Sequence, residues 1–525
     1  MAEQDQKLPR EQMGGGGGVL LVVSDVPEAE EKDSGKESDQ KVPILVPEPD
    51  DLAMPDEPEK TGDEACNFES NEEQTKAIDL PENEKKALQE LKHLLQDALD
   101  RHEFEASAGA EKKTTPEAKS VSETEKDSAL DPPVQTIAEA LLEDDGAKTL
   151  EAIEETIVAA VRSKEKPEET IVSQKVSIWG IKLLEDDRSD VILLKFLQAR
   201  EFKAKEAFTM IKNTITWRRE FGIDELVEED LGCRDLERVV YTYGHSREGH
   251  PVCYNVYGEF QDKELYQNTF SDELKRQRFL RWRIQFLERS IRKLDFRPGG
   301  ISTIVQVNDL KNSPGPNRWE LRQATNQALH LLQDNYPEFV AKQIFINVPW
   351  WYLALSKMIS PFLTQRTKSK FVVAGPSKST ETLLKYVCGE QIPTQYGGLS
   401  NGGNFGTDDT VSEVIVKPSA KHVVEFSVDE ECIVRWEVRV VGWEVSYGAE
   451  FVPNAETGYT VIIQKMKKIP NSSSSGDEDR VEMVSCSYRV GEPGKVVLAI
   501  NNPTSRKKKL LYRFKTNPNS ADVVD

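Results

Sequence analysis

The spacing of apolar residues changes along this chain, and each change marks a different kind of structure. Between about residues 173 and 399, stretches with helical spacing alternate with short, continuous apolar runs. Such runs are typical of strands covered on both faces, so this region is predicted to be an α/β lobe. Helices are expected at residues 190–196, 204–221, 273–294, 318–332, 350–363 and 380–387, and strands at 239–243, 252–257, 301–307, 344–348 and 371–374.

Helical spacing ends at a glycine-rich connector, residues 397–403, whose composition predicts a flexible link. The runs beyond it are short, rich in β-branched and aromatic residues, and separated by Pro, Gly and Asn, which is typical of an all-β sandwich. The polar insert at residues 471–479 is predicted to be an exposed, mobile loop. Eight strands are expected, at residues 414–416, 422–428, 432–441, 443–451, 460–465, 481–488, 495–501 and 509–514.

Residues 1–170 show neither pattern over most of their length. They are rich in Pro, Ser, Gln, Glu and Lys, and their formal charge is −26 against +3 for residues 171–525, which gives the −23 of the 525-residue chain. Such a segment buries too little apolar surface to offset its chain entropy. It is predicted to be an acidic, mostly disordered region with possible helices at residues 82–102 and 134–161.

The chain shows no sign of a membrane span or of a disulfide framework. It lacks the roughly 20 consecutive apolar residues that a spanning helix needs, and its six cysteines lie far apart without a CxxC pair. A cleavable signal is not indicated either. We therefore expect a cytoplasmic protein that is soluble or bound to a membrane surface.

Residues 330–375 are the part of the α/β lobe that points to a lipid. They place Glu338 and Lys370 at the two ends of a long apolar passage. The helix expected at residues 350–363 is apolar on nearly all sides, so it must be covered on more than one side. It is either a core helix buried by protein or a gate that faces a lipid. As a gate, it would line the cavity with Trp350, Trp351, Leu355, Met358 and Phe362.

Basic residues gather at several places where an anionic membrane could be bound. Each basic residue near an anionic bilayer contributes up to about 1 kcal/mol. The helix at residues 273–294 is also basic, but an amphipathic helix packed on the sheet explains it better than a membrane or nucleic-acid contact. A nucleic-acid partner is not expected for this acidic chain. The membrane-contact candidates are Arg366 and Lys368 after the apolar helix, and Arg506, Lys507, Lys508 and Lys509 at an expected loop tip of the sandwich, where simple solvation is the alternative.

Catalysis and metal binding are not indicated. The HExxH, GxSxG and GxxxxGK[ST] motifs are absent. Glu338 has the chemistry of a general acid or base, but a Tyr-Pro-Glu turn beside a buried strand more often anchors a loop. His245 and His250 flank a turn with Gly and Pro and have no third ligand at a usual spacing, so a hairpin is expected there. The chain is predicted not to be an enzyme.

Several motifs resemble those of one protein family. LLKFLQAR at residues 193–200 and WRREFG at 217–222 resemble the N-terminal helical part of CRAL-TRIO domains, the fold of the phosphatidylinositol transfer proteins. The C-terminal strands, with Lys417-Pro418 and Trp436, resemble a GOLD domain. An acidic tail followed by these two domains is similar to the arrangement of the plant patellins. The CRAL-TRIO resemblance continues in NYPE at 335–338, INVP at 346–349, PFL at 361–363 and YGG at 396–398.

The resemblance implies a multidomain fold. It combines a disordered acidic N-terminal region, an α/β CRAL-TRIO lipid-binding domain with its helical part, and a C-terminal all-β GOLD sandwich. The expected boundaries are 1–170 for the acidic region, 171–255 for the helical part and first strands, 239–400 for the lipid-binding lobe, 401–412 for a linker, 413–518 for the sandwich and 519–525 for a tail.

The resemblance also implies a function. Patellins are peripheral membrane proteins that bind phosphoinositides, so membrane trafficking is expected, at the plasma membrane and in cell-plate formation during cytokinesis. The implied ligand is a bound phospholipid, phosphatidylinositol or a phosphoinositide, with no other cofactor. The implied partners are an anionic membrane and, through the GOLD domain, other proteins. A protein-interaction scaffold with a vestigial lipid cavity is the alternative.

Residue by residue, the resemblance places the lipid headgroup at Glu338, Lys370 and Arg200. Two departures from the family pattern accompany it. Glu201 stands where a basic residue is usual, and Gln306 replaces a small hydroxyl side chain of the two-lipid exchangers, so choline-lipid exchange is not expected. Thr115, which precedes a proline in the acidic region, is a phosphorylation candidate. Added phosphate there would strengthen the repulsion from an anionic membrane.

Overall fold

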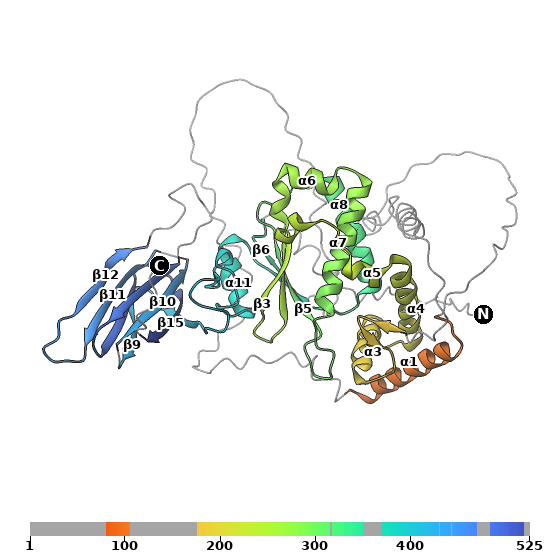
Figure 1. The fold of residues 1–525 in the computed structure, drawn as a ribbon, viewed down its shortest axis with the longest axis horizontal. Coiled ribbons are helices and arrows are strands. Elements are labelled where there is room, and N and C mark those ends of the chain that lie inside the picture. The colour runs from red at the N-terminus through yellow and green to blue at the C-terminus, as the bar shows by residue number, and fades with distance from the viewer. Residues whose placement is uncertain are drawn as a thin grey trace, which may run out of the picture.

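The computed structural model describes residues 80–104, 176–314, 318–349, 369–429, 431–442, 444–469 and 483–518. Figure 1 shows three parts in a row, with a helical part at one end, an α/β lobe in the middle and a β-sandwich at the other end. The predicted order of an α/β lobe followed by an all-β sandwich is confirmed.

The helical part is defined by clear helix-ending signals. Asp186 caps α3, because its side chain accepts a hydrogen bond from the backbone N–H of Arg188. Gly222 ends α4 in the left-handed conformation, with φ of 69°, which glycine adopts without strain. Its elements are α1 (Glu82–Asp100), β1 (Ser177–Ile178), β2 (Ile181–Lys182), α3 (Asp187–Ala199), α4 (Ala204–Phe221) and α5 (Ile223–Glu228).

Helix α1 confirms the helix expected at residues 82–102 and packs on α3 and α4. Leu91, Leu95 and Ala98 on one face of α1 are fully buried in the core of the helical part. Lys92 on its other side forms an ion pair with Asp190 of α3, with Nζ and Oδ1 2.6 Å apart. Residues 80–104 thus belong to the folded body, which their acidic surroundings in the sequence did not indicate.

The central lobe contains a five-stranded sheet in the order β3-β4-β5-β6-β7. Strands β3 and β4 form the expected antiparallel hairpin, and β4 to β7 run parallel. Helices α6 to α8 lie on one side of this sheet and α11 on the other (Figure 1). The strands are β3 (Val240–His245), β4 (Pro251–Val256), β5 (Ile304–Asp309), β6 (Val340–Ile346) and β7 (Phe371–Val373).

Helix α7 shows how the basic helix is accommodated. Its apolar side chains Phe279 and Trp282 are buried, while Arg281 and Arg292 form ion pairs with Glu229 and Asp224. The predicted packing of an amphipathic helix on the sheet is confirmed. The helices of the lobe are α6 (Lys263–Phe270), α7 (Glu273–Ile291), α8 (Trp319–Asn335) and α11 (Ser379–Tyr386), with short 3-10 helices at Arg234–Arg238, Tyr257–Gln261, Pro376–Lys378 and Thr394–Tyr396.

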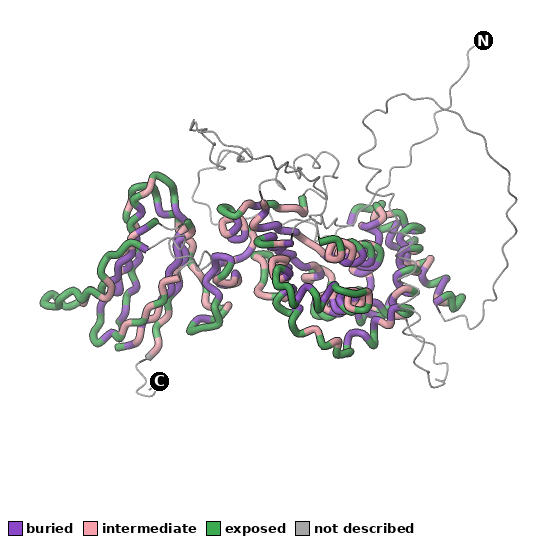
Figure 2. Tube along the Cα trace, turned by 90° about the horizontal axis from the view of Figure 1, so that it is seen from above, coloured by how far each residue is buried: buried purple, intermediate pink, exposed green. Residues whose placement is uncertain are grey.

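The sandwich has all eight expected strands, in two antiparallel sheets with the orders β13-β10-β15-β8 and β12-β11-β14-β9. Its buried positions run between the two sheets (Figure 2). Trp436 and Tyr447 join the sheets at the centre, where the indole Nε1 donates to the phenol oxygen at 2.7 Å. The strands are β8 (Ser412–Val416), β9 (Ala420–Val428), β10 (Cys432–Val441), β11 (Ser446–Pro453), β12 (Val461–Lys468), β13 (Val484–Val490), β14 (Gly494–Asn502) and β15 (Lys508–Pro518).

Two buried arginines fix the sandwich to the lobe. Arg439 donates to the carbonyl oxygens of Thr394 and Gly398, at 2.7 and 2.5 Å. Arg513 donates to the carbonyl oxygen of Leu399 at 2.6 Å and pairs with Glu437, with its Nη2 2.7 Å from Oε2. Both guanidinium groups are almost fully buried, so the two parts share one continuous polar and apolar interface.

The glycine-rich connector is therefore not flexible over its first half. Residues 396–400 are buried, and their carbonyl groups are held by the two arginines. Gly397 is required here, because its φ is 93° and a Cβ atom would overlap the side chain of Thr380. The prediction of a flexible link was wrong for these residues, since composition does not reveal contacts made from distant strands.

The docking of α1 predicts a loss of stability when its core face is truncated. Replacing Leu91 by Ala should lower the free energy of unfolding by about 2–5 kcal/mol, the usual cost of emptying a fully buried leucine site. Glu90→Ala on the exposed face of the same helix is the control and should change it by less than about 0.5 kcal/mol. Urea denaturation of the full chain measures both. Equal stability of the two variants would contradict the docking of α1.

Candidate functional site

The candidate site is built around the turn between α8 and β6. Glu338 occupies this turn in the left-handed conformation, with φ of 56°. Its carboxylate lies 2.6 Å from Nζ of Lys370, which directly precedes β7. The side chains are only 7% and 17% exposed, so this ion pair is largely removed from water. The structure thus brings together the two residues that the sequence placed at the ends of the apolar passage.

A second buried ion pair anchors the same turn. The phenol of Tyr336 donates to Oε1 of Glu288 at 2.7 Å, and Arg218 donates to both oxygens of that carboxylate. Arg218 belongs to α4 and Glu288 to α7. The turn is therefore held by the helical part and the central lobe together, which fixes the position of Glu338.

Lys195 is a member of this site that sequence reasoning missed. It lies on α3, is 4% exposed, and its Nζ donates to the backbone oxygen of Glu338 at 2.9 Å. The ammonium also lies 4.6 Å from the ring centre of Phe339. The signal was present in the sequence, because Lys195 interrupts the apolar run of α3, and a lysine buried among apolar residues needs a polar partner.

The environment of Lys195 makes it titratable near neutral pH. Burial lowers the pKa of Lys195 to about 7, with the charge of Glu338 acting to raise it and that of Lys370 to lower it. An amine with this pKa gains a proton when a negative charge arrives next to it. Lys195, Glu338 and Lys370, which we call the Glu338 cluster, can therefore hold an anionic group together with neighbouring hydroxyl groups.

Other predicted site residues lie elsewhere. Arg200 ends α3 and donates to the carbonyl oxygen of Ala199 at 3.1 Å. No described hydrogen bond or ion pair joins Arg200 to Glu338 or Lys370. The following predicted residues lie outside the described part of the chain: Thr115, Trp350, Trp351, Leu355, Met358, Phe362, Arg366 and Lys368.

The sheet carries a row of buried amides on the face that packs against α7 and α8. Asn255 and Asn308 are opposite each other in β4 and β5, and Gln306 and Gln343 are opposite each other in β5 and β6. Asn255 donates to Asn308 at 3.1 Å. Within the described residues, Oε1 of Gln306, Oε1 of Gln343 and Nδ2 of Asn308 have no hydrogen-bond partner. A buried amide without a partner is costly, so this face is suited to a polar group of a ligand or to water.

A cavity of about 30 Å³ opens beside this row of amides. Its polar lining consists of Asn255, Tyr257, Arg283 and Thr325, and the rest of its wall is apolar. Arg283 donates to Oδ1 of Asn255 at 3.3 Å, and no carboxylate in the described ranges pairs with it. The volume is sufficient for about two water molecules.

The predicted basic tip of the sandwich is only partly exposed. Arg506 and Lys507 are exposed, as expected. Lys508 is 9% exposed and donates to the carbonyl oxygen of Gly442 at 2.8 Å. Lys509 forms an ion pair with Glu413, at 3.0 Å, beside the lobe. The expectation of a four-residue exposed tip is therefore wrong for Lys508 and Lys509, because residue 508 begins strand β15.

Comparisons with known proteins identify the domains. The family model for the CRAL/TRIO domain matches residues 237–398, that for the CRAL/TRIO N-terminal domain matches residues 140–213, and that for the Patellin-1-like C-terminal GOLD domain matches residues 417–509. Patellin-3 of Arabidopsis thaliana is 53% identical over 452 residues, which cover 85% of this chain and 77% of Patellin-3. This chain belongs to the patellin family. The resemblance seen in the sequence motifs is confirmed.

Further relatives of this patellin extend the comparison. Patellin-5 of Arabidopsis thaliana is 62% identical over 351 residues, which cover 66% of this chain and 51% of Patellin-5. The chain thus spans about half the length of that relative. A phosphatidylinositol transfer protein, SFH5 of Meyerozyma guilliermondii, is 29% identical over 275 residues, covering 49% of this chain and 76% of SFH5. Within the described ranges, no helix combines the length and apolar character needed to cross a membrane.

The lowered pKa of Lys195 predicts a pH dependence of stability. Between pH 7 and 10.5 the unfolded chain keeps the proton on Lys195 while the folded chain releases it, so this group makes stability rise with pH. Relative to Lys195→Met, the free energy of unfolding of the wild type should increase by at most about 1.4 kcal/mol per pH unit across this window. Urea denaturation from pH 6 to pH 9.5 measures the difference.

The control for this titration is Lys205→Met, which removes an exposed lysine from the next helix. Its stability should run parallel to that of the wild type over the same pH range. A constant difference between wild type and Lys195→Met would show that Lys195 stays charged in the folded protein and would contradict the lowered pKa.

Proposed function

We propose that this chain binds phosphatidylinositol or a phosphoinositide in its CRAL-TRIO lobe and acts as a peripheral membrane protein in membrane trafficking. The observation that carries the proposal is the Glu338 cluster. The ammonium of Lys370 pairs with the nearly buried carboxylate of Glu338, and a second amine, that of Lys195, donates to the backbone oxygen of the same residue. A purely structural ion pair needs one cation, so the second amine favours an anionic ligand at this position.

The chemistry of the cluster matches an inositol phosphate headgroup. The ammonium of Lys370 would share its charge between Glu338 and a lipid phosphate, which adds a charge-assisted hydrogen bond. A carboxylate can accept about four hydrogen bonds, so Glu338 would accept from inositol hydroxyls in addition to its bond with Lys370. Lys195 would take up a proton as the phosphate arrives, because a neighbouring negative charge raises the pKa of an amine. Arg200, at the end of the same helix, is proposed as an outer contact.

The acyl chains of the lipid require an enclosed site. Each exposed CH₂ group costs about 0.8 kcal/mol in water, so a carried phospholipid has to keep its tails covered. We place them beside the buried amide face of the sheet, where the unpartnered Nδ2 of Asn308 would donate to an ester carbonyl of a glycerolipid. The residues proposed to line and gate this site are Trp350, Trp351, Leu355, Met358 and Phe362.

The wider role follows from family membership and stays a proposal. It comprises action at the plasma membrane and the cell plate during cytokinesis, with protein partners bound through the GOLD domain. Basic residues beside the gate, Arg366 and Lys368, would contact the anionic membrane. The acidic region would weaken that contact, and phosphorylation at Thr115 would weaken it further by added negative charge. The name of the related phosphatidylinositol transfer protein supports the choice of lipid.

The proposal predicts loss of inositol lipid when both charges of the ion pair are removed together. A single change at Lys370 would leave the carboxylate of Glu338 buried and unpaired, at a cost of about 3–5 kcal/mol. The double variant Glu338→Gln, Lys370→Met avoids this penalty and should melt near the wild-type temperature. Its affinity for phosphatidylinositol should fall about tenfold or more, which is about 1.4 kcal/mol. Native mass spectrometry of lipid-loaded full-length protein measures the occupancy.

The control neutralises an ion pair of the sandwich, with Glu425→Gln on strand β9 and Lys495→Met on strand β14. This variant should keep its lipid. Unchanged occupancy in the Glu338 and Lys370 double variant would refute the headgroup assignment. Wild-type protein that neither co-purifies with lipid nor takes it up from vesicles would favour a protein-interaction scaffold with a vestigial cavity.

A further inference from the structure

Strand β12 exposes an unusual number of apolar side chains. It is the edge strand of its sheet and pairs only with β11. Four of the ten large apolar side chains that are exposed among the described residues lie between residues 459 and 466. They are Tyr459, Val461, Ile462 and Met466, which are 89%, 44%, 61% and 49% exposed. A patch of this kind marks an interaction surface in a protein that is otherwise well packed.

Unpaired positive charge accompanies this apolar patch. Lys465, Lys467 and Lys468 are exposed, and no carboxylate of the described residues pairs with any of them. Other sandwich lysines do have such partners, for example Lys495 with Glu425 and Lys515 with Asp409. Strand β12 itself contains no acidic residue. Its surroundings do: Glu450 lies opposite Ile462 in β11, and Glu456 lies in the connecting loop.

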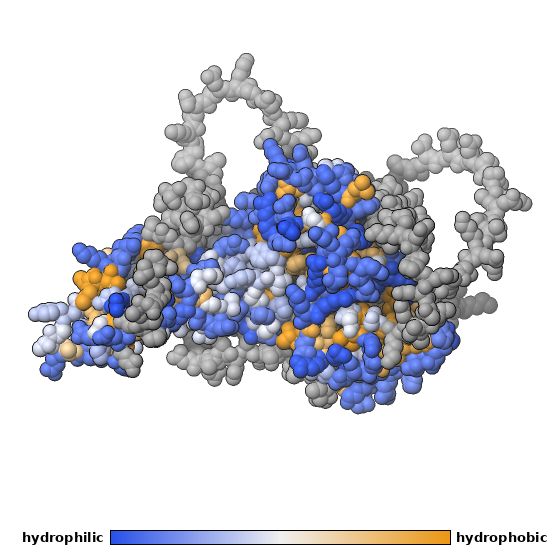
Figure 3. Space-filling model, in the orientation of Figure 1, coloured by the Kyte–Doolittle hydropathy of each residue, from blue (hydrophilic) through white to orange (hydrophobic). Residues whose placement is uncertain are grey.

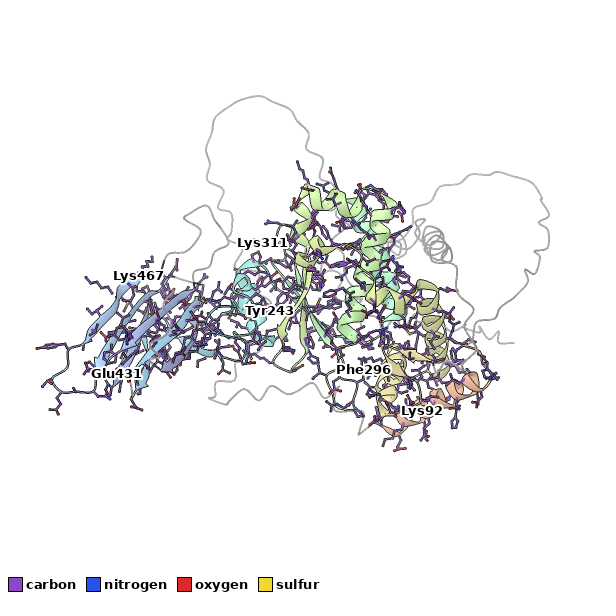
Figure 4. The ribbon with its side chains drawn as sticks, viewed as in Figure 1. Lys92, Tyr243, Phe296, Lys311, Glu431 and Lys467 are labelled. Atoms are coloured by element: carbon purple, nitrogen blue, oxygen red, sulfur yellow. The ribbon has the colours of Figure 1, made fainter. Side chains whose placement is uncertain are left out.

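The same end of the sandwich is visible in the surface views. Figure 3 shows apolar surface gathered where Figure 1 places β11 and β12, with strongly hydrophilic surface beside it. Lys467 is labelled on this part of the sandwich in Figure 4. Apolar and basic side chains are therefore presented together on one exposed strand.

Protection of the sheet edge explains the exposed lysines of β12 but not its exposed apolar side chains. Lysines on an edge strand discourage pairing with strands of other proteins, and the register shifts between Tyr447 and Glu450 disturb the ladder further. Protection of an edge does not require Ile462 or Met466 to be exposed, because polar residues would serve equally well. Strand addition by a protein partner is disfavoured by the same lysines and register shifts.

We infer that residues 459–468 form a membrane-contact surface for bilayers with anionic lipids. Tyr459, Ile462 and Met466 would enter the interfacial layer, while Lys465, Lys467 and Lys468 bind lipid phosphates. Apolar side chains flanked by basic ones are the combination that interfacial binding uses. The inference rests on the proposed function only in that both involve a membrane, since β12 belongs to the sandwich and not to the lipid-binding lobe.

The position of this surface relative to the lipid site is fixed by the contacts between the sandwich and the lobe. The buried Arg439 and Arg513 join the sandwich to the closing segment of the lobe. A membrane bound at β12 therefore restricts the orientations in which the lobe meets the same bilayer. Two contacts that are held on one rigid body bind with a higher effective concentration than two that are independent.

The test is flotation of the full-length chain on vesicles of phosphatidylcholine with about 20% phosphatidylserine. The apolar variant Ile462→Ser, Met466→Ser should reduce the bound fraction about fivefold at every salt concentration. The basic variant Lys465→Gln, Lys467→Gln, Lys468→Gln should reduce it by a similar factor at low salt and differ little from wild type at high salt. The control Ile415→Ser, Val423→Ser changes two exposed apolar residues on strands β8 and β9 and should bind like wild type.

Pocket lipid, measured by native mass spectrometry, separates this inference from the proposed function. Loss of flotation with retained pocket lipid supports a membrane surface at β12. Wild-type flotation in both β12 variants overturns it and leaves the lipid site untouched. If either variant melts well below the wild type, the flotation test uses Tyr459→Ser instead. Tyr459 is 89% exposed and lies outside the strand. An unchanged bound fraction in that variant would equally contradict the surface.

Discussion

A buried carboxylate has to be paired, and the pairing of Glu338 organises the lipid-binding lobe. The carboxylate of Glu338 pairs with Lys370, which lies just before β7, and its backbone oxygen accepts a hydrogen bond from Lys195 on α3 of the helical part. The ion pair of Arg218 and Glu288 holds the neighbouring Tyr336. Removing Lys370 or Arg218 would leave a carboxylate unpaired in the interior, which costs more than the pair contributes. These contacts hold Glu338 in a left-handed conformation, with φ of 56°, that glycine would adopt more easily.

The same principle explains why the sandwich is not a loosely tethered domain. Arg439 and Arg513 are almost fully buried, and their guanidinium groups satisfy carbonyl oxygens of the closing segment of the lobe. Buried guanidinium groups demand this many acceptors, so the segment cannot leave without exposing them. Lipid binding in the lobe and any membrane contact of the sandwich are thus geometrically coupled.

Much of the fold could be predicted from the sequence, and the misses have physical causes. The eight sandwich strands and the parallel strands follow from short apolar runs, their β-branched and aromatic residues, and the Pro, Gly and Asn residues between them. Helix α6 was missed, although helix α11 has the same number of residues and was predicted. Periodicity also gives neither strand boundaries nor register. It therefore could not show that Lys508 begins strand β15 or that Lys509 pairs with Glu413. Gly397 and Gly398 read as flexible because their partners, Arg439 and Arg513, are distant in the sequence.

Only part of the candidate site was predicted, because its third member is positioned by a contact between residues that are distant in the sequence. Glu338 and Lys370 stand in recognisable motifs, whereas Lys195 lies in an apolar helix where charge is unexpected. Its role depends on a contact across 143 residues of sequence. A buried lysine within an apolar run is nevertheless a usable signal, because such a residue needs either a partner or a shifted pKa.

The central claim is that Lys195 and Lys370 bind the phosphate of an inositol lipid while Glu338 accepts hydrogen bonds from its hydroxyl groups. Calorimetric titration with short-chain phosphatidylinositol at pH 8, in buffers of different ionisation enthalpy, tests it most directly. Because the pKa of Lys195 is about 7, most of the free protein holds this amine neutral, and binding should take up a proton fraction approaching one per lipid. Lys195→Met should bind without proton uptake. Binding by the wild type with no proton uptake, or with the same uptake as Lys195→Met, would contradict the claim.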